Sequence, residues 1–216
     1  MSKIVIYCAG SQGMVVSDIL SRSLPDFEIY FIDDDLVGKI INNKKVYSLD
    51  DFLSNAEKTG LIIANGNPKI RESIFKQIKS CNFDLINVID KSAIVMPSSH
   101  IGIDNVVAIN AVVNSNTAIG SHCIINTGSI IEHDCKIDDF VTICPGVQIG
   151  GKSIIGYGSF ICTGAIILPR IRIGKGSVIA AGSVVTKDIP DFSFVKGTPA
   201  RVLHSVNGNF DWNKLL

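Results

Sequence analysis

Isoleucine or valine returns at every sixth position over nearly half of this 216-residue chain. The run begins at Ile89 and reaches Val185, and it fills 17 of 17 positions without an insertion. Ile and Val together make up 54 of the 216 residues. Chance would therefore produce this run with odds on the order of one in ten billion. A period of six matches neither the 3.6-residue turn of an α-helix nor a heptad, so it specifies another kind of fold.

Each six-residue unit has the composition of a short strand followed by a corner. Four residues after each Ile or Val the side chain is usually small, as at Ala111, Ser129 and Ala165. Turn formers such as Pro145-Gly146 lie two and three places after it. Three units make one triangular turn, and stacked turns pair as parallel strands about 4.8 Å apart. We therefore predict a hexapeptide β-helix of nearly six turns over residues 89–201.

Residues 1–88 have a different texture, in which apolar strands alternate with amphipathic helices. The expected order is strand, turn, helix, strand, helix, strand, with strands at 3–8, 29–32 and 61–64. This order predicts a small Rossmann-like α/β domain. The last segment, 202–216, is expected to form a C-terminal tail that contains Phe210 and Trp212.

The first strand of this domain runs into a glycine-containing turn, Ala9-Gly10-Ser11-Gln12-Gly13. Such a turn suits a phosphate at the N-terminus of the following helix. Asp33 and Asp34 end the second strand about 20 residues later, where carboxylates suit sugar hydroxyls or a base edge. The turn lacks the full G-x-G-x-x-G motif, so NAD is not expected, and a tight turn without a ligand remains an alternative.

The most suggestive chemical feature lies at a corner of the predicted β-helix. His133 and Asp134 occupy its first and second corner positions, and an adjacent carboxylate fixes the tautomer of an imidazole and raises its basicity. Gly151 stacks on the same edge one turn later, where a missing side chain leaves space for a long, thin ligand. These features predict a general base, with an exposed corner residue and a plain turn former as the alternative.

Composition and spacing exclude several classes of function. Lys+Arg and Asp+Glu both number 20, so no basic field is available for a nucleic-acid backbone. No apolar run approaches the roughly 20 residues of a membrane span, and the N-terminus does not resemble a signal peptide. The histidines fall at unequal register positions, so no metal site is expected. The six cysteines show no C-x-x-C spacing and predict free thiols in a reducing cytoplasm.

The residues resemble one family over essentially the whole chain: the bacterial sugar O/N-acetyltransferases of the sialic acid O-acetyltransferase type. That family joins a Rossmann-like domain to a left-handed β-helix, and the hand is taken from this resemblance. The segments that carry the resemblance are Tyr7-Cys8-Ala9-Gly10-Ser11-Gln12-Gly13, Phe31-Ile32-Asp33-Asp34, Gly66-Asn67-Pro68-Lys69-Ile70-Arg71, Ile131-Glu132-His133-Asp134-Cys135 and Gly197-Thr198-Pro199-Ala200-Arg201.

The resemblance implies a homotrimer with active sites between subunits, and acetyl-CoA as co-substrate. His133 would be the base, and Asp134 would raise its basicity. Contacts to acetyl-CoA would fall at Thr142, Gly151, Thr163 and Ala181. The nucleotide-sugar would contact Gly10, Ser11, Gln12, Asp33, Asp34 and Gly66. Two positions depart from the pattern, because many relatives have histidines where this chain has Gln12 and Thr142.

The function that follows is N-acetylation of a nucleotide-linked 4-amino-4,6-dideoxy sugar, with UDP as the expected nucleotide, by direct transfer in a ternary complex for surface-glycan biosynthesis. O-acetylation of a sialic acid or a related sugar is the first alternative, and GDP- or dTDP-linked amino sugars also remain open. A non-enzymatic β-helix scaffold with a nucleotide-sensing domain is a remote third possibility.

Overall fold

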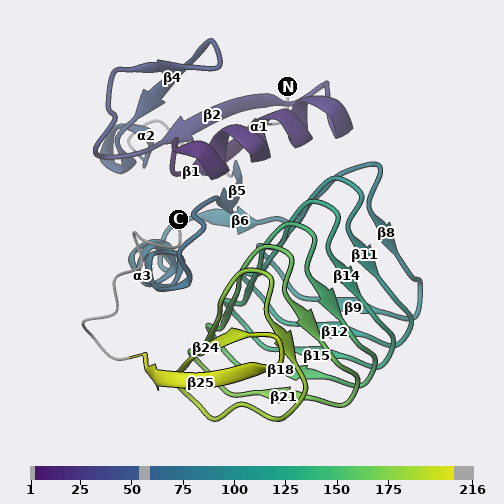
Figure 1. Ribbon diagram of the computed structural model, residues 1–216. Coiled ribbons are helices and arrows are strands. Elements are labelled where there is room, and N and C mark those ends of the chain that lie inside the picture. The colour runs from purple at the N-terminus through teal and green to yellow at the C-terminus, as the bar shows by residue number, and fades with distance from the viewer. Residues whose placement is uncertain (1–2, 54–58, 207–216) are drawn as a thin grey trace.

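The computed structural model describes residues 3–53 and 59–206 and joins an α/β domain to a parallel β-helix (Figure 1). The α/β domain has a six-stranded sheet in the order β3-β4-β2-β1-β5-β6. All neighbouring strands are parallel except β3 and β4, which form an antiparallel pair. The elements are β1 Lys3–Tyr7, α1 Ser11–Ser23, β2 Glu28–Ile32, β3 Ile40–Ile41, β4 Lys44–Tyr47, α2 Leu49–Leu53, β5 Thr59–Ile63, α3 Pro68–Ile78 and β6 Phe83–Leu85.

The two long helices form where the sequence supplies an apolar face and a start signal. Helix α1 buries Val16, Ile19 and Leu20 against the sheet, at the helical spacing that the sequence displays. Helix α3 begins with a proline, and the Asn67 side chain caps it by accepting a hydrogen bond of 3.0 Å from the Lys69 N–H. The strands β3, β4 and β6 are additions that the sequence pattern did not predict.

The β-helix has three faces, and each face is a sheet of very short strands stacked one turn apart. The first face contains β7 Val88–Ile89, β10 Val106–Val107, β13 Ile124–Ile125, β16 Thr142–Ile143, β19 Phe160–Ile161, β22 Val178–Ile179, β24 Ser193–Gly197 and β25 Ala200–Ser205. The second face contains β8 Ile94–Val95, β11 Val112–Val113, β14 Ile130–Ile131, β17 Gln148–Ile149, β20 Ile166–Ile167 and β23 Val184–Val185. The third face contains β9 His100–Ile101, β12 Ala118–Ile119, β15 Lys136–Ile137, β18 Ile154–Ile155 and β21 Arg172–Ile173.

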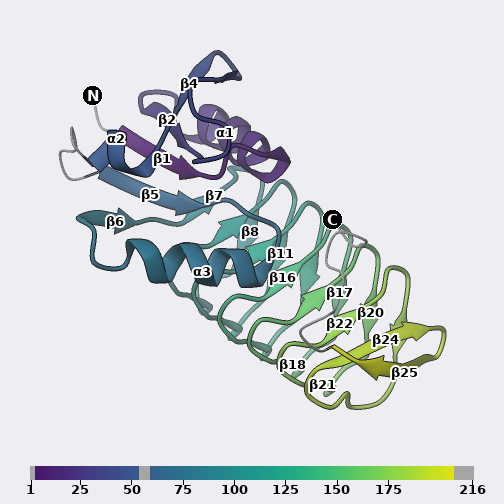
Figure 2. The same cartoon turned by 90° about the vertical axis from the view of Figure 1, so that its left-hand side faces the viewer.

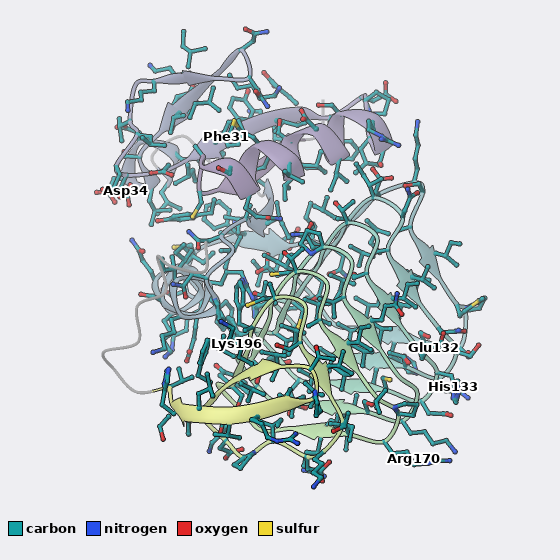
Figure 3. The ribbon with its side chains drawn as sticks, in the orientation of Figure 1. Phe31, Asp34, Glu132, His133, Arg170 and Lys196 are labelled. Carbon is teal, nitrogen blue, oxygen red and sulfur yellow. The ribbon has the colours of Figure 1, made fainter. Side chains whose placement is uncertain are left out.

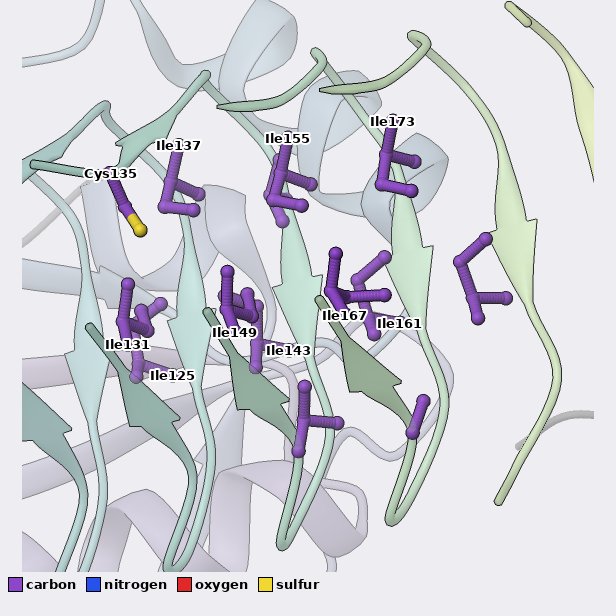
Figure 4. Close-up of a cluster of buried hydrophobic side chains, with 14 of the residues drawn as sticks. Ile125, Ile131, Cys135, Ile137, Ile143, Ile149, Ile155, Ile161, Ile167 and Ile173 are labelled. Carbon is purple, nitrogen blue, oxygen red and sulfur yellow. The ribbon is translucent and has the colours of Figure 1, made fainter. Parts of the chain in front are cut away.

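The repeating Ile and Val side chains fill the interior of this prism, as Figure 4 shows for its central turns. Ile131, Ile143 and Ile155 come from the three different faces, and each is fully buried. Along each face the same position pairs with itself one turn later, as Ile131 does with Ile149. This stacking confirms the predicted β-helix, and the chain as a whole has the predicted combination of an α/β domain and a β-helix.

The corners explain the second regularity in the repeat. From Asp104 to Gly182, the third residue after every inward Ile or Val adopts a left-handed backbone, for example at Asp134, Lys152 and Gly164. Glycine, asparagine and aspartate tolerate this conformation best. The turn formers at most corners therefore reflect this backbone conformation, although His122, Phe140, Lys152 and Arg170 also adopt it.

The α/β domain covers the upper part of the first face, with α3 alongside the coils (Figure 2). The outward side chains of that face, including Val106 and Ile124, are buried in one cluster with Ile6 and Val16 of the α/β domain. Val88, at the start of the first face, belongs to the same cluster. The α/β domain and the β-helix therefore share a continuous apolar interface, and the position of one is fixed relative to the other.

Strands β24 and β25 close the C-terminal end as an antiparallel pair on the first face. Strand β25 includes the first residues of the segment expected to form a tail, 202–205. Phe210 and Trp212 lie outside the described residues.

Candidate active site

His133 and Asp134 form a hydrogen-bonded pair at the corner between the second and third faces. Nδ1 of His133 lies 2.8 Å from Oδ2 of Asp134, and the imidazole is 54% exposed. When Nδ1–H donates to this carboxylate, Nε2 carries the free lone pair that a general base requires. The hydrogen bond from His133, with help from Asn116 and the charge of Lys152, lowers the pKa of the Asp134 carboxyl. Asp134 therefore remains a carboxylate beside the ring at neutral pH.

Neighbouring coils hold this pair in place. Asn116, one turn earlier, donates to Asp134 Oδ1 at 3.5 Å, and the Asp134 N–H donates to the Ser115 carbonyl. The preceding side chain, Glu132, accepts a hydrogen bond of 3.1 Å from Asn114. The pair thus has its orientation set by the coil beneath it.

Gly151 lies directly against the imidazole. A Cβ at this position would be 2.8 Å from Nε2 and 2.9 Å from Cε1 of His133, closer than carbon atoms normally approach. The space that the missing side chain leaves is therefore occupied by the histidine ring itself. Only glycine at position 151 permits the observed position of the His133 ring.

Basic side chains continue along the same corner, which we call the His133 edge. Lys152 and Arg170 follow Asp134 at one-turn intervals, and both are exposed. Figure 3 shows Arg170 close to His133 at this side of the molecule. A row of cations beside the imidazole provides a place for the phosphates of a long ligand.

Thr163 and Ala181 lie on a different corner, between the first and second faces, which we call the Thr163 edge. Both residues are exposed, and Gly182 donates its N–H to the Thr163 carbonyl, which shows that they stack on successive turns. Within one chain, the second face separates them from Gly151. The structure does not bring these three residues together at one edge of a single subunit.

Thr142 lies elsewhere again, on the outside of the first face beneath α3. It is 2% exposed, and its hydroxyl contacts the Arg71 guanidinium at 2.9 Å and the Gly66 carbonyl at 3.0 Å. Its side chain is therefore used in the contact between the two domains, a setting that the repeat pattern did not predict.

A cavity of about 580 Å³ opens in the α/β domain at the carboxyl ends of β1, β2 and β5. This is the edge where parallel α/β sheets bind ligands. The six residues for which sequence reasoning predicted substrate contacts all line it: Gly10, Ser11, Gln12, Asp33, Asp34 and Gly66. Residues for which no substrate contact was predicted complete the wall: Tyr7, Cys8, Asp35, Ala64, Asn65, Ile70, Ile74 and Gln77.

Two of the three aspartates in the wall of this cavity have different tasks. Asp33 accepts hydrogen bonds from the Ala9 N–H at 2.9 Å and the Asp35 N–H at 3.1 Å, so both of its oxygens hold backbone. Asp34 accepts one from the Leu49 N–H at 3.0 Å, and its second oxygen lies 3.4 Å from the Tyr7 hydroxyl. Asp34 therefore presents the less committed carboxylate to a ligand.

The turn before α1 is unusually tight. Cys8 has a left-handed backbone, and a Cβ on Gly13 would meet the Cys8 carbonyl oxygen in a severe clash. Next to this turn, Gln12 has a buried side-chain nitrogen with no hydrogen-bond partner among the described residues. An unpaired buried donor at the cavity wall is available to an acceptor on a ligand.

The cavity is negative in character. Asp33, Asp34 and Asp35 lie in its wall, and its described lining includes no lysine or arginine. Burial and the carboxylates of Asp34 and Asp33 raise the pKa of Tyr7, and burial raises the pKa of the Cys8 thiol to about 11. The lining therefore offers acceptors to a base or sugar, and the N–H groups at the start of α1 are its main donors toward a phosphate.

The cavity and the imidazole are well separated in one chain. Figure 3 shows Asp34 and His133 at opposite sides of the molecule. Among the described residues no group of His, Cys, Asp and Glu is arranged to hold a metal ion. No helix in those same ranges is long and apolar enough to cross a membrane.

Comparisons with known proteins match both parts of the chain. Residues 3–78 match the PglD N-terminal domain family, and residues 128–163 match the bacterial transferase hexapeptide family. GDP-perosamine N-acetyltransferase of Escherichia coli O157:H7 is 32% identical over 156 residues, which cover 69% of this chain and 71% of that protein.

Two solved structures are similar over nearly the whole chain. A mutant of perosamine N-acetyltransferase from Caulobacter crescentus, in complex with CoA and GDP-perosamine, has a TM-score of 0.89 at 26% identity, covering 95% of this chain and 98% of its own. The acetyltransferase domain of PglB from Neisseria gonorrhoeae, in complex with acetyl coenzyme A, has a TM-score of 0.88 at 34% identity, covering 93% and 98%.

Proposed function

This chain belongs to the family of nucleotide-amino-sugar N-acetyltransferases that join a PglD-type N-terminal domain to hexapeptide repeats, and we propose that His133 is the base of its reaction. It is an acetyl-CoA-dependent acyltransferase. The acceptor that we propose is the amine of a nucleotide-linked 4-amino-4,6-dideoxy sugar. The observation that carries the assignment of the base is the His133–Asp134 pair seated on Gly151.

The family assignment corrects one expectation from the sequence. The resemblance pointed to the sialic acid O-acetyltransferase type, whereas the matched relatives belong to the amino-sugar N-acetyltransferase branch. The expected nucleotide was UDP, but the Escherichia coli relative is named for a GDP-linked sugar, and the Caulobacter crescentus structure contains one. We therefore place GDP- and UDP-linked amino sugars side by side as the first acceptors to test.

The chemistry of the base follows from its two nitrogens. Nδ1 is committed to Asp134, so Nε2 takes the proton as the sugar nitrogen attacks the thioester carbon. The tetrahedral intermediate then expels the CoA thiolate, which takes up a proton and leaves as the free thiol. The products are the N-acetylated sugar and CoA. Asp134 stabilises the imidazolium that exists between these steps.

We propose that acetyl-CoA lies between two chains of a homotrimer in the cytoplasm. The outward side chains of the second face are largely apolar, and Ile94 is 52% and Ile166 37% exposed. An exposed apolar face of this kind favours burial against a second copy. Packing of neighbouring chains would set the His133 edge of one opposite the Thr163 edge of the next. Gly151 from one subunit and Thr163 and Ala181 from the other would then line one groove.

The first test is thiol release from acetyl-CoA with a panel of acceptors. The panel contains GDP-, UDP- and dTDP-linked 4-amino-4,6-dideoxy sugars and free sialic acid. Rapid release with one amino sugar, and a product mass that shows one N-acetyl group, supports the proposal and identifies the nucleotide. Release with sialic acid alone would overturn it in favour of O-acetylation.

A further inference from the structure

A buried arginine joins the cavity of the α/β domain to the β-helix. Arg71, on α3, is 1% exposed, and burial lowers the pKa of its guanidinium to about 10. It makes no ion pair within 4.0 Å among the described residues, and backbone carbonyls take most of its hydrogen bonds. Burial of a cation costs free energy unless its N–H donors are hydrogen-bonded. This network therefore holds the backbone carbonyls that accept from Arg71 in fixed positions.

The contacts of Arg71 fall into two groups. Its Nη1 donates to the carbonyls of Asn65 at 2.7 Å and Gly66 at 3.0 Å, which form part of the cavity wall. Its Nε and Nη2 donate to the β-helix, to the carbonyls of His122 at 3.0 Å and Phe140 at 2.9 Å. The guanidinium therefore spans from the cavity wall to two successive coils.

Thr142 completes the link from the β-helix side. Its hydroxyl oxygen accepts from Arg71 Nη2 at 2.9 Å and donates its proton to the Gly66 carbonyl at 3.0 Å. The Gly66 carbonyl thus has two donors, one from each domain. Thr142 belongs to the coil that follows His133. The wall of the cavity is therefore bound to a coil next to the one that carries His133.

A second buried pair, Asp104 and His122, holds the chain at Ile63, the residue before the cavity wall Ala64–Gly66. Asp104, from the β-helix, accepts a hydrogen bond of 2.9 Å from the Ile63 N–H and pairs with His122 at 2.7 Å. The His122 ring in turn stacks on Phe140 at 4.4 Å. Side chains of the β-helix therefore hold both ends of segment 63–66. The residues Ala64, Asn65 and Gly66 lie beyond the end of strand β5, so the pairing of that strand does not hold them.

We propose that Thr142, acting with Arg71, is a positioning residue for the nucleotide-sugar: it fixes the Asn65–Gly66 wall of the cavity in the shape that binds this substrate. This role rests on the proposed function of the cavity. It differs from the contact to acetyl-CoA that the sequence suggested for Thr142. The two roles predict changes in different Michaelis constants. If Thr142 fixes the wall, its loss raises the KM for the sugar, whereas if Thr142 contacts acetyl-CoA, its loss raises the KM for acetyl-CoA.

The test compares Thr142→Val with Thr142→Ser. Valine keeps the shape but leaves a guanidinium N–H and the Gly66 carbonyl without this partner, whereas serine keeps the hydroxyl. We expect Thr142→Val to raise the KM for the accepted sugar by roughly tenfold, with kcat and the KM for acetyl-CoA changed by less than about twofold. Thr142→Ser should restore the KM for the sugar.

The matched control is Ser177→Ala, which removes another buried hydroxyl of the β-helix, bonded to the Pro190 carbonyl at 2.8 Å. It should lower the melting temperature and leave both KM values unchanged. Calorimetry with GDP and UDP on wild type and Thr142→Val measures the cavity without turnover, and the variant should bind the preferred nucleotide more weakly.

The outcomes separate this role from the proposed function. An active wild type whose Thr142→Val variant keeps the KM for the sugar, or raises the KM for acetyl-CoA instead, overturns the positioning role alone. If the wild-type protein binds a nucleoside diphosphate but acetylates no amino sugar, the proposed function alone is contradicted. The nucleotide affinity of Thr142→Val then decides the positioning role. If wild type neither binds a nucleotide nor acetylates a sugar, both fail.

Discussion

Replacement of Gly151 by alanine perturbs the His133 edge by a single methyl group. The added Cβ would lie 2.8, 2.9 and 3.3 Å from Nε2, Cε1 and Cδ2 of the His133 ring. Carbon contacts are comfortable at about 3.5–4.0 Å, so the imidazole must retreat by roughly 0.5–1 Å. Gly151 does not have a left-handed backbone, and the ring is half exposed. The chain can therefore fold, and the displacement falls on the base.

The expected consequence is a loss of turnover without a loss of stability. A misplacement of about 1 Å costs on the order of 100-fold in rate, so kcat of Gly151→Ala should fall by roughly 10- to 100-fold. Steady-state thiol release and thermal melting on the same preparation measure the two effects.

Gly158→Ala is the matched control for this substitution. Gly158 lies at a corner between the third and first faces, with a φ of +63° and no atom within 4 Å of an added Cβ. Alanine at this position should lower the free energy of unfolding by about 1–2 kcal/mol through backbone strain, and the melting temperature by a few degrees. It should leave kcat unchanged. Wild-type kcat in Gly151→Ala would refute the placement of the base over Gly151.

Three further predictions concern the rest of the site. Asp134→Asn keeps the shape of the pair but removes the charge that stabilises the imidazolium, so kcat measured by thiol release should fall by roughly 10- to 100-fold; an unchanged rate would show that His133 acts without it. Gly13→Ala places a methyl group against the Cys8 carbonyl and should lower the melting temperature by about 3–10 °C, whereas a wild-type melting curve would contradict the tight turn. Because burial raises the pKa of Cys8 to about 11, its thiolate is scarce below that pH. Its alkylation by iodoacetamide at pH 8, followed by mass spectrometry, should run about 100-fold slower than that of a free thiol and should accelerate as the pH approaches 11.

The β-helix could be predicted from sequence because its constraint is local and repeated. Each inward position, such as Ile131 or Ile149, meets the same environment as its neighbour one turn away, so one rule applies 17 times. The corner pairing of His133, Asp134 and Gly151 follows from the same register, since a fixed period converts sequence separation into spatial stacking. Most of the left-handed corners could also be predicted from their asparagine, aspartate and glycine residues, whereas those at His122, Phe140, Lys152 and Arg170 could not.

The interface between the domains could not be predicted in this way. Arg71 and Thr142 are 71 residues apart and come from elements of different periodicity, so no repeat relates them. A threonine on a strand is compatible with an exposed face, and only the docking of α3 buries Thr142. The cavity was predicted in part for a similar reason. Its glycine turn and aspartates carry a recognisable signal, whereas Tyr7 and Gln77 reach the wall from elements that resemble ordinary core.

The most direct test of the central claim is a single-turnover measurement of acetyl transfer in wild type and His133→Ala. Acetyl-CoA and the amino sugar that wild type accepts are mixed with excess enzyme, and calorimetry measures the affinity for acetyl-CoA in parallel. We predict a rate that falls by about 100- to 10,000-fold while the affinity for acetyl-CoA stays within about threefold of wild type. A His133→Ala variant that transfers the acetyl group at nearly the wild-type rate would contradict the assignment of His133 as the base.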